Sequence, residues 1–111
     1  MRSQMLKGIL EGCILAIIER EAVYGYTLSK QLHENGLTEI SEGTIYPVLL
    51  RLQKNGYIVG EMRPSEAGPD RKYYTLTPEG KQALEQIRKE WKSLVPSVNN
   101  ILFKEWYDDG R

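Results

Sequence analysis

Residues 41–78 read SEGTIYPVLLRLQKNGYIVGEMRPSEAGPDRKYYTLTP, and the pattern of this stretch decides the fold. Its first part predicts a helix. Ser41 is a suitable N-cap, and Glu42 places a negative charge at the positive end of the helix dipole. Apolar residues at helical spacing give the helix one buried face, and Asn55-Gly56 ends it. These apolar residues are Ile45, Val48, Leu49 and Leu52.

The second part of the stretch predicts a β-hairpin that leads into another helix. Tyr57–Met62 and Arg71–Leu76 have the composition of strands, and the loop Pro64–Asp70 between them contains proline and glycine. Thr77-Pro78 is a favoured start of a helix, because the threonine hydroxyl caps the first turn. The backbone N–H that proline lacks has no partner within the helix at this position, so no hydrogen bond is lost.

The residues before this stretch predict two further helices. Apolar residues recur at helical spacing through residues 4–20, which indicates an amphipathic helix. Tyr24-Gly25-Tyr26 marks a turn. Thr27–Asn35 then predicts a short helix that ends before Gly36, because glycine is common just after a helix C-terminus.

The last helix carries a seam of apolar residues at heptad spacing. The seam consists of Leu84, Ile87, Trp91, Leu94, Val98 and Ile101. A helix of this length at the end of so small a domain cannot cover the seam alone, so we expect a partner to cover it. Pro96 predicts a kink or a break, with Ser97–Trp106 continuing as helix.

The chain has 111 residues, which is the size of one domain. We expect residues 1–77 and a C-terminal helix over residues 78–111 to form one compact unit. The 15 basic and 15 acidic residues balance, so the charge total does not indicate a nucleic-acid partner. The longest apolar stretch is far shorter than the ~20 residues of a membrane span, and no secretion-signal pattern is present. We therefore expect a cytoplasmic protein.

The sequence argues against an enzyme and against a metal site. Cys13 and His33 are its one cysteine and its one histidine, too few for an internal disulfide or a conventional metal centre. No catalytic set of His, Cys and carboxylate and no phosphate-binding glycine loop has usable spacing. We expect no cofactor.

The order of the predicted elements is that of a winged helix-turn-helix, a mostly helical fold with a small β-hairpin. In this fold the third helix can enter a DNA major groove and the hairpin, or wing, reaches the backbone. A helical projection turns one face of the third helix outward, with Thr44 at its border. That face consists of Gly43, Tyr46, Pro47, Leu50, Arg51 and Lys54. The Tyr46 hydroxyl and the cations Arg51 and Lys54 can form hydrogen bonds with phosphates and base edges. The alternative interpretation is an ordinary helix face that contacts only solvent.

In the wing, strand alternation sends Arg71 and Tyr73 to one face and Lys72 and Tyr74 to the other. One pair can pack inward while the other meets a phosphate, and the pattern does not decide between the two pairs. Ordinary sheet packing of both tyrosines is the alternative.

Several motifs occur together in this chain. They are YGYTL at 24–28, EGTIYPVL at 42–49 with Arg51-Leu52, NGYI at 55–58, GP at 68–69 and RKYYTLT at 71–77 with Gly80. In this combination the sequence resembles the PadR-type transcriptional regulators, specifically the short members that end soon after one C-terminal helix. The resemblance covers nearly the whole chain.

The resemblance implies a homodimeric repressor, and we expect its operator to be a pseudo-palindromic stretch of double-stranded DNA. The third helix would read the operator through Tyr46 and Arg51. The wing would contact the DNA backbone through its own matching residues, which are Arg71, Lys72 and Tyr73.

The resemblance also implies that the first and last helices build the dimer, with Leu6 and Leu10 joining the seam of the last helix. Some members bind planar aromatic or phenolic effectors between the subunits, next to a tryptophan of the last helix. Trp91 stands at the matching place, although interface core is the interpretation we favour for it. A different class of function is also open, namely a protein-interaction module that uses the C-terminal helix, with the winged helix as scaffold.

Overall fold

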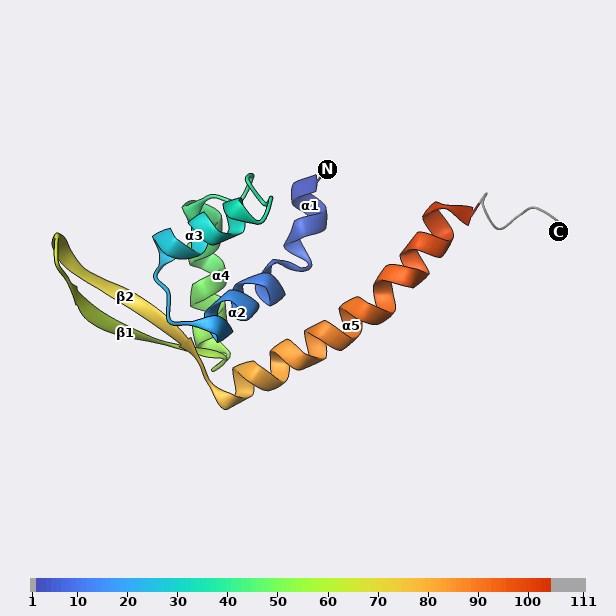
Figure 1. Cartoon of the computed structure of the whole chain (residues 1–111). Helices are drawn as coiled ribbons and strands as arrows, with labels where there is room; N and C mark the ends of the chain where they lie inside the picture. The colour runs from blue at the N-terminus through green and yellow to red at the C-terminus, as the bar shows by residue number, and fades with distance from the viewer. Residues whose placement is uncertain (1, 105–111) are drawn as a thin grey trace.

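The computed structural model describes residues 2–104. Within them the chain is mostly helical. A β-hairpin follows the first four helices and leads into a long final helix, and the hairpin and the final helix extend to opposite sides of the helical body (Figure 1). The elements are α1 (Arg2–Lys7), α2 (Leu10–Arg20), α3 (Gly25–Glu34), α4 (Glu42–Lys54), β1 (Ile58–Ser65), β2 (Gly68–Leu76) and α5 (Pro78–Leu102). This order confirms the predicted winged helix-turn-helix with a C-terminal helix.

The predicted single helix over residues 4–20 is wrong, because the structure has two helices there. The break lies at Gly8-Ile9, where the Ile9 N–H donates to the Leu6 carbonyl at 3.0 Å in a tight turn. Glycine favours such a break because it loses more conformational freedom in a helix than other residues do. No residue of α1 is buried, so packing does not hold α1 in line with α2.

The core lies between α2, α3, α4 and the base of the hairpin. Its largest fully buried side chains are Ile14, Leu15, Val23, Leu28, Leu32, Ile45, Leu49, Leu52, Ile58 and Leu84. The first turns of α5 join this core at close range, because a Cβ on Gly12 would lie only 2.6 Å from the Ile87 side chain. The inward face of α4 packs in this core, and its outward face is exposed to solvent.

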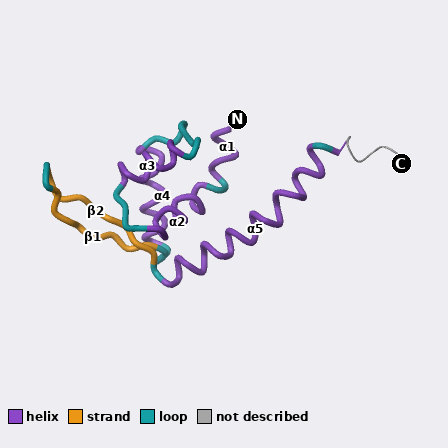
Figure 2. The backbone as a smooth tube through the Cα atoms, viewed as in Figure 1, coloured by secondary structure: helices purple, strands orange, loops and turns teal. Residues whose placement is uncertain are grey.

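The hairpin strands are longer than predicted. Residues assigned to the loop Pro64–Asp70 belong largely to the strands, and only Glu66-Ala67 forms the turn at the tip. A register irregularity between Arg63 and Ser65 accommodates Pro64, which cannot donate to the ladder. The hairpin projects from the helical body, as the strands in Figure 2 show.

A β-bridge ties the base of the hairpin to the segment between α2 and α3. The Tyr74 N–H donates to the Val23 carbonyl at 2.8 Å, and the Val23 N–H donates back to the Tyr74 carbonyl at 3.4 Å. Both residues are buried. The wing is therefore held at a defined angle to the start of α3.

Helix α5 continues through Pro96, so the predicted break is wrong, and the kink that the sequence indicates at Pro96 stays a prediction. Most residues around Pro96 are exposed, so water can satisfy the carbonyl that proline leaves without a donor. The predicted helical continuation ends earlier, at Leu102, and Trp106 lies outside the described residues. None of the helices within residues 2–104 has the length and hydropathy needed to cross a membrane.

Beyond its first turns, α5 runs as an arm away from the helical body (Figure 1). The Cα radius of gyration is 17.2 Å, against about 13 Å for a compact chain of this length. The arm exposes several large apolar side chains. These are Trp91, Leu94, Val98, Ile101, Leu102 and Phe103.

Candidate nucleic-acid interface

The outward face of α4 is exposed, as the helical projection predicts, while its inward face is buried. The exposed residues are Gly43, Thr44, Tyr46, Pro47, Leu50, Arg51 and Lys54. The Ser41 hydroxyl oxygen accepts a hydrogen bond from the Thr44 N–H at 3.3 Å and lies 3.2 Å from the Thr44 hydroxyl. This capping fixes the first turn of the helix, and with it the direction in which the exposed face points.

Gly43 leaves a gap in the side-chain cover of this face. A Cβ at Gly43 would make one ordinary contact, at 3.7 Å from the Ser41 hydroxyl oxygen. Its φ is not positive, so an L side chain is allowed there. Packing within the described residues therefore does not require glycine at this position, and the gap leaves room for a close approach by another molecule.

Tyr46 lies across the first residue of α3. A Cβ on Gly25 would lie 2.9 Å from the Tyr46 hydroxyl and 3.1 Å from two of its ring carbons. Tyr46 is 52% exposed, so its ring is held in place on one side and open to solvent on the other. Tyr74 is close by, and burial, with a smaller contribution from Tyr46, raises the pKa of Tyr74.

Arg51 is paired within the chain. Its Nε donates to Oε2 of Glu11 on α2 at 2.8 Å. The pair is partly exposed, so the guanidinium remains accessible to a further partner. Leu50 next to it is 63% exposed, which places an apolar side chain in the middle of the outward face of α4.

One face of the wing carries a cluster of arginines and tyrosines. The Arg71 guanidinium lies 4.6 Å from the centre of the Tyr24 ring and donates to the Tyr24 hydroxyl at 2.7 Å. Tyr24 packs edge-to-face against Tyr73 at 5.2 Å, and Arg63 lies 4.9 Å from the centre of the Tyr73 ring. Tyr26 stacks on Tyr24, with the ring centres 6.3 Å apart. This cluster joins the wing to the start of α3.

The other face of the wing holds Tyr74 and Lys72. Tyr74 is buried at the hairpin base. The Lys72 side chain crosses Gly60, where a Cβ would lie 2.3 Å from the Lys72 Cε, and its ammonium lies 5.8 Å from the centre of the Tyr74 ring. The strand pattern did not decide which pair of residues packs inward. In the structure the face with Lys72 and Tyr74 packs inward at its base, and the face with Arg71 and Tyr73 lies beside α3.

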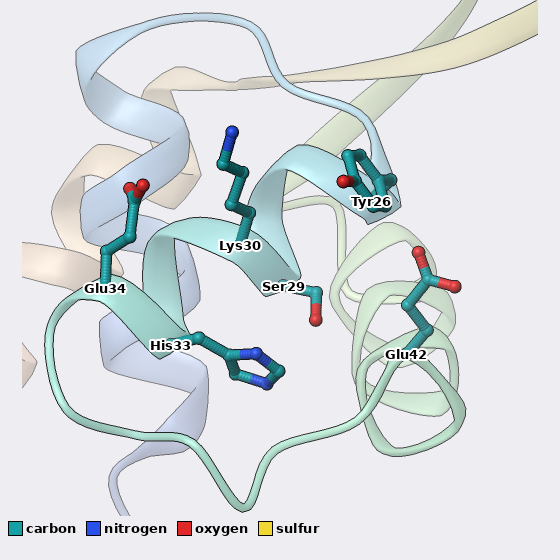
Figure 3. A pocket seen from close by; sticks show the side chains of 6 residues that line it. All are labelled: Tyr26, Ser29, Lys30, His33, Glu34 and Glu42. Carbon is teal, nitrogen blue, oxygen red and sulfur yellow. The ribbon is translucent and has the colours of Figure 1, made fainter.

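A shallow pocket of about 460 Å³ lies between α3 and the start of α4. It is lined by Tyr26, Ser29, Lys30, His33, Glu34 and Glu42. Ser29 and His33 point toward the space across from Glu42 (Figure 3). The His33 ring contacts the Ile40 carbonyl through Nε2, which fixes the turn between the two helices. Residues 2–104 contain no cluster of His, Cys, Asp or Glu that could hold a metal ion.

A second, larger hollow lies between α5 and the α1–α2 segment. This apolar groove has a volume of about 800 Å³, and its lining includes Leu6, Cys13, Ile87 and Trp91. Burial raises the pKa of the Cys13 thiol. Trp91 is 50% exposed, and the rest of the predicted seam, Leu94, Val98 and Ile101, continues along the exposed arm.

Two residues of the predicted dimer seam lie in the core of the single chain instead. Leu10 and Leu84 are 3% and 1% exposed, so both belong to the core of the single chain. The heptad spacing could not reveal this, because the first turns of α5 pack on α2 with the same periodicity that the free arm shows. The candidate seam is therefore limited to Leu6, Ile87 and the exposed residues of the arm.

Comparison with known proteins supports a role in transcription. A model of the transcriptional regulator PadR-like family matches residues 14–86. The chain belongs to this family. A PadR-like regulator of Bacillus cereus is 52% identical, with a TM-score of 0.81, over 89% of this chain and 96% of that one. A PadR family regulator of Eggerthella lenta is 32% identical, with a TM-score of 0.83, over 92% and 88% of the two chains.

A transcriptional regulator of Mycobacterium tuberculosis is 37% identical over 76 residues, which are 68% of this chain and 69% of that protein. Family membership confirms the resemblance inferred from the motifs. It also makes this PadR-like chain a transcriptional regulator rather than an enzyme, and DNA binding follows from that role.

Sequence reasoning missed three members of the wing cluster of this PadR-like chain, namely Arg63, Tyr24 and Tyr26. Arg63 lies directly opposite Arg71 in the hairpin. Extending the strand pattern through Pro64 would have placed Arg63 on the same face as Arg71. No local pattern brings Tyr24 to the wing, because the contact depends on the bridge between Val23 and Tyr74.

Proposed function

We propose that this PadR-like regulator is a cytoplasmic homodimeric repressor that binds a pseudo-palindromic operator through α4 and the wing. The observation that carries the proposal is a continuous surface that we call the recognition surface. It runs from Gly43 and Tyr46 on α4, across Tyr24 at the start of α3, to Arg71 in the wing. A helix face beside a cationic hairpin suits a major groove and the adjoining phosphates.

Further exposed residues extend this surface. On α4 these are Thr44, Pro47, Arg51 and Lys54, and in the wing the half-buried Tyr73 joins Arg71. Lys72, which is also exposed, lies on the opposite face of the wing and would contact the DNA backbone apart from this surface. Tyr46 and Arg51 have donors that reach base edges or phosphates. Because the whole chain carries no net charge, long-range attraction to DNA is weak. Specificity then depends on local contacts and on the geometry of a dimer.

The exposed arm of α5 supports the dimer. Leu94 and Ile101 are 54% and 74% exposed in the single chain, and a second copy related by a twofold axis would cover them. A twofold dimer presents two α4 helices to two half-sites about one helical turn apart, ~10 bp.

The apolar groove beside Trp91 supports the binding of a small planar aromatic or phenolic effector in the same region.

Selection of bound sequences from random or genomic DNA tests the proposal. The expected result is a motif with inverted half-sites, bound with an affinity that falls steeply as salt rises. Tyr46→Ala and Arg51→Ala should each weaken binding to that motif and leave the dimer intact. The proposal fails if no duplex is bound in a salt-dependent manner, and a stable complex with a different protein would then favour an interaction module.

Whether the regulator represses or activates transcription needs a separate measurement. A reporter gene placed behind the recovered operator should show lower expression in the presence of the regulator. Higher expression would assign an activator role and leave DNA binding unaffected.

The effector proposal is tested by Trp91 fluorescence against a panel of planar aromatic and phenolic compounds, and it fails if none of them changes the emission.

A further inference from the structure

The wing places two arginines side by side on one face. Arg63 on β1 and Arg71 on β2 are direct partners in the antiparallel register. Directly opposite residues in such a pair lie on the same face, with their Cβ atoms about 5 Å apart. The two guanidinium groups therefore start from neighbouring points on the face that lies beside α3.

Each guanidinium is supported by a tyrosine. Arg63 lies over Tyr73 at 4.9 Å and Arg71 over Tyr24 at 4.6 Å, and the two rings contact each other at 5.2 Å. The bond from Arg71 Nη1 to the Tyr24 hydroxyl fixes one orientation further. Stacking on aromatic faces holds a guanidinium in place while leaving its in-plane donors free for a ligand.

The charges of the pair are only partly compensated. Glu61 accepts a hydrogen bond from Arg63 Nε at 2.9 Å, which leaves the two terminal nitrogens of Arg63 for another partner. Within residues 2–104, Arg71 forms no ion pair with a carboxylate. Like charges directly opposite each other destabilise a hairpin, so this arrangement is most stable when an anion lies between them.

We propose that Arg63 and Arg71 together bind one phosphate group of the DNA backbone. The inference rests on the proposed function and adds Arg63, with Tyr24 and Tyr73 as positioning residues, to the DNA-binding surface. A guanidinium presents paired donors that match phosphate oxygens, and two guanidinium groups can hold one phosphate from two sides. Lys72 does not take part, because it lies across Gly60 on the opposite face.

The number of phosphates bound can be read from the salt dependence of DNA binding. The logarithm of the binding constant falls with the logarithm of salt concentration, with a slope of about −0.9 for each phosphate neutralised. We would measure this slope by fluorescence anisotropy with the full chain and two labelled duplexes, the selected operator and a scrambled version. The variants are Arg63→Gln, Arg71→Gln and the double variant, with Lys81→Gln as a control that removes an exposed cation on α5.

If both arginines hold one phosphate, each single variant loses about five- to tenfold in affinity but changes the slope little, because the other arginine still neutralises that phosphate. The double variant should flatten the slope by about 0.9 on both duplexes, and Lys81→Gln should change neither quantity. Thermal unfolding of each variant shows whether the hairpin still folds.

Three outcomes would overturn the inference. Single variants that each flatten the slope by about 0.9, with the double variant at about 1.8, would mean two separate phosphates. Unchanged slope and affinity in the double variant would leave the pair a structural feature of the hairpin. A loss on the operator that is absent on the scrambled duplex would mean a base contact. In all three the unmodified protein still binds DNA, whereas failure of the proposed function would abolish binding by the unmodified protein itself.

Discussion

Arg51 on α4 donates a hydrogen bond from Nε to Oε2 of Glu11 on α2, at 2.8 Å. The cation on the outward face of α4 is thus already paired with a carboxylate in the free protein. Both side chains are partly exposed, at 52% and 35%. A DNA phosphate that approaches Arg51 must therefore compete with Glu11, so the free protein restrains one of the DNA contacts that we propose for it.

Glu11→Gln should strengthen binding to non-specific duplex DNA by about three- to tenfold at low salt. The amide can still accept from Arg51, but it no longer competes with phosphate through its charge. The free energy of unfolding should change by less than about 0.5 kcal/mol, because partly exposed ion pairs contribute little. Anisotropy titrations and urea unfolding measure the two quantities. Glu21→Gln, at an exposed carboxylate, is the matched control, and equal effects of both variants would contradict this prediction.

Gly43→Ala should have opposite effects on stability and on DNA binding. Alanine favours a helix over glycine by up to about 1 kcal/mol, and the new Cβ meets no close contact in the chain. The same methyl group fills the gap where we expect DNA to approach, so operator affinity should fall about tenfold or more. Gly8→Ala offers a comparable change away from this face. An unchanged operator affinity for Gly43→Ala would show that DNA does not approach α4 there.

Gly25→Ala should weaken operator binding about as much as Tyr46→Ala does. The added Cβ would lie 2.9 Å from the Tyr46 hydroxyl, so the ring must move from its place over α3. The ring is half exposed and can swing outward, so the loss of stability should stay below about 1 kcal/mol. The double variant should be no weaker than either single variant, because both act through the same ring. Additive losses in anisotropy would mean that Gly25 acts independently of Tyr46.

Leu94→Asp should prevent the proposed dimer from forming and leave a monomer. Leu94 is 54% exposed in the single chain, so a charge there costs nothing until a second copy covers it. Sedimentation should show a monomer, and operator affinity should fall at least about 100-fold, because two half-sites are then no longer bound as one unit. Asn99→Asp adds a charge on a different side of α5 and should preserve the dimer. A dimeric Leu94→Asp protein would place the interface elsewhere.

Tyr74 should make the protein less stable at alkaline pH. Burial raises its pKa in the folded chain above the ordinary value of about 10. The unfolded chain therefore loses this proton first, and stability falls as pH rises above about 10. Tyr74→Phe should remove this part of the loss, as measured by urea unfolding at pH 8 and near pH 11. Equal pH dependence in both proteins would contradict the assignment.

The bounds of α4 could be predicted almost to the residue. Ser41 and Glu42 mark its start, Asn55-Gly56 marks its end, and the apolar spacing identifies its buried face. These signals are local, because capping and amphipathic burial depend on residues within a few positions of one another. The outward position of Gly43 and Tyr46 followed from the same pattern.

Predictions that depended on contacts between distant segments were less successful. The break at Gly8-Ile9, the continuity of α5 through Pro96 and the length of the hairpin all depend on how each segment is exposed or packed. Leu10 and Leu84 have the spacing of a dimer seam, yet they lie in the core of the single chain. Periodicity identifies an apolar face but does not say which neighbour covers it.

The sequence by itself determined the order of the elements apart from the break between α1 and α2, the face that α4 presents and, through its motifs, the family. Only the tertiary structure decided which residues hold the arginines of α4 and of the wing in place. Arg51 is paired with Glu11 across α2 and α4, and Arg71 is placed on Tyr24 by the bridge between Val23 and Tyr74. The physical reason is that helix and strand patterns arise from neighbouring residues, whereas these contacts join residues 40 and 47 positions apart and form only when the core brings their elements together.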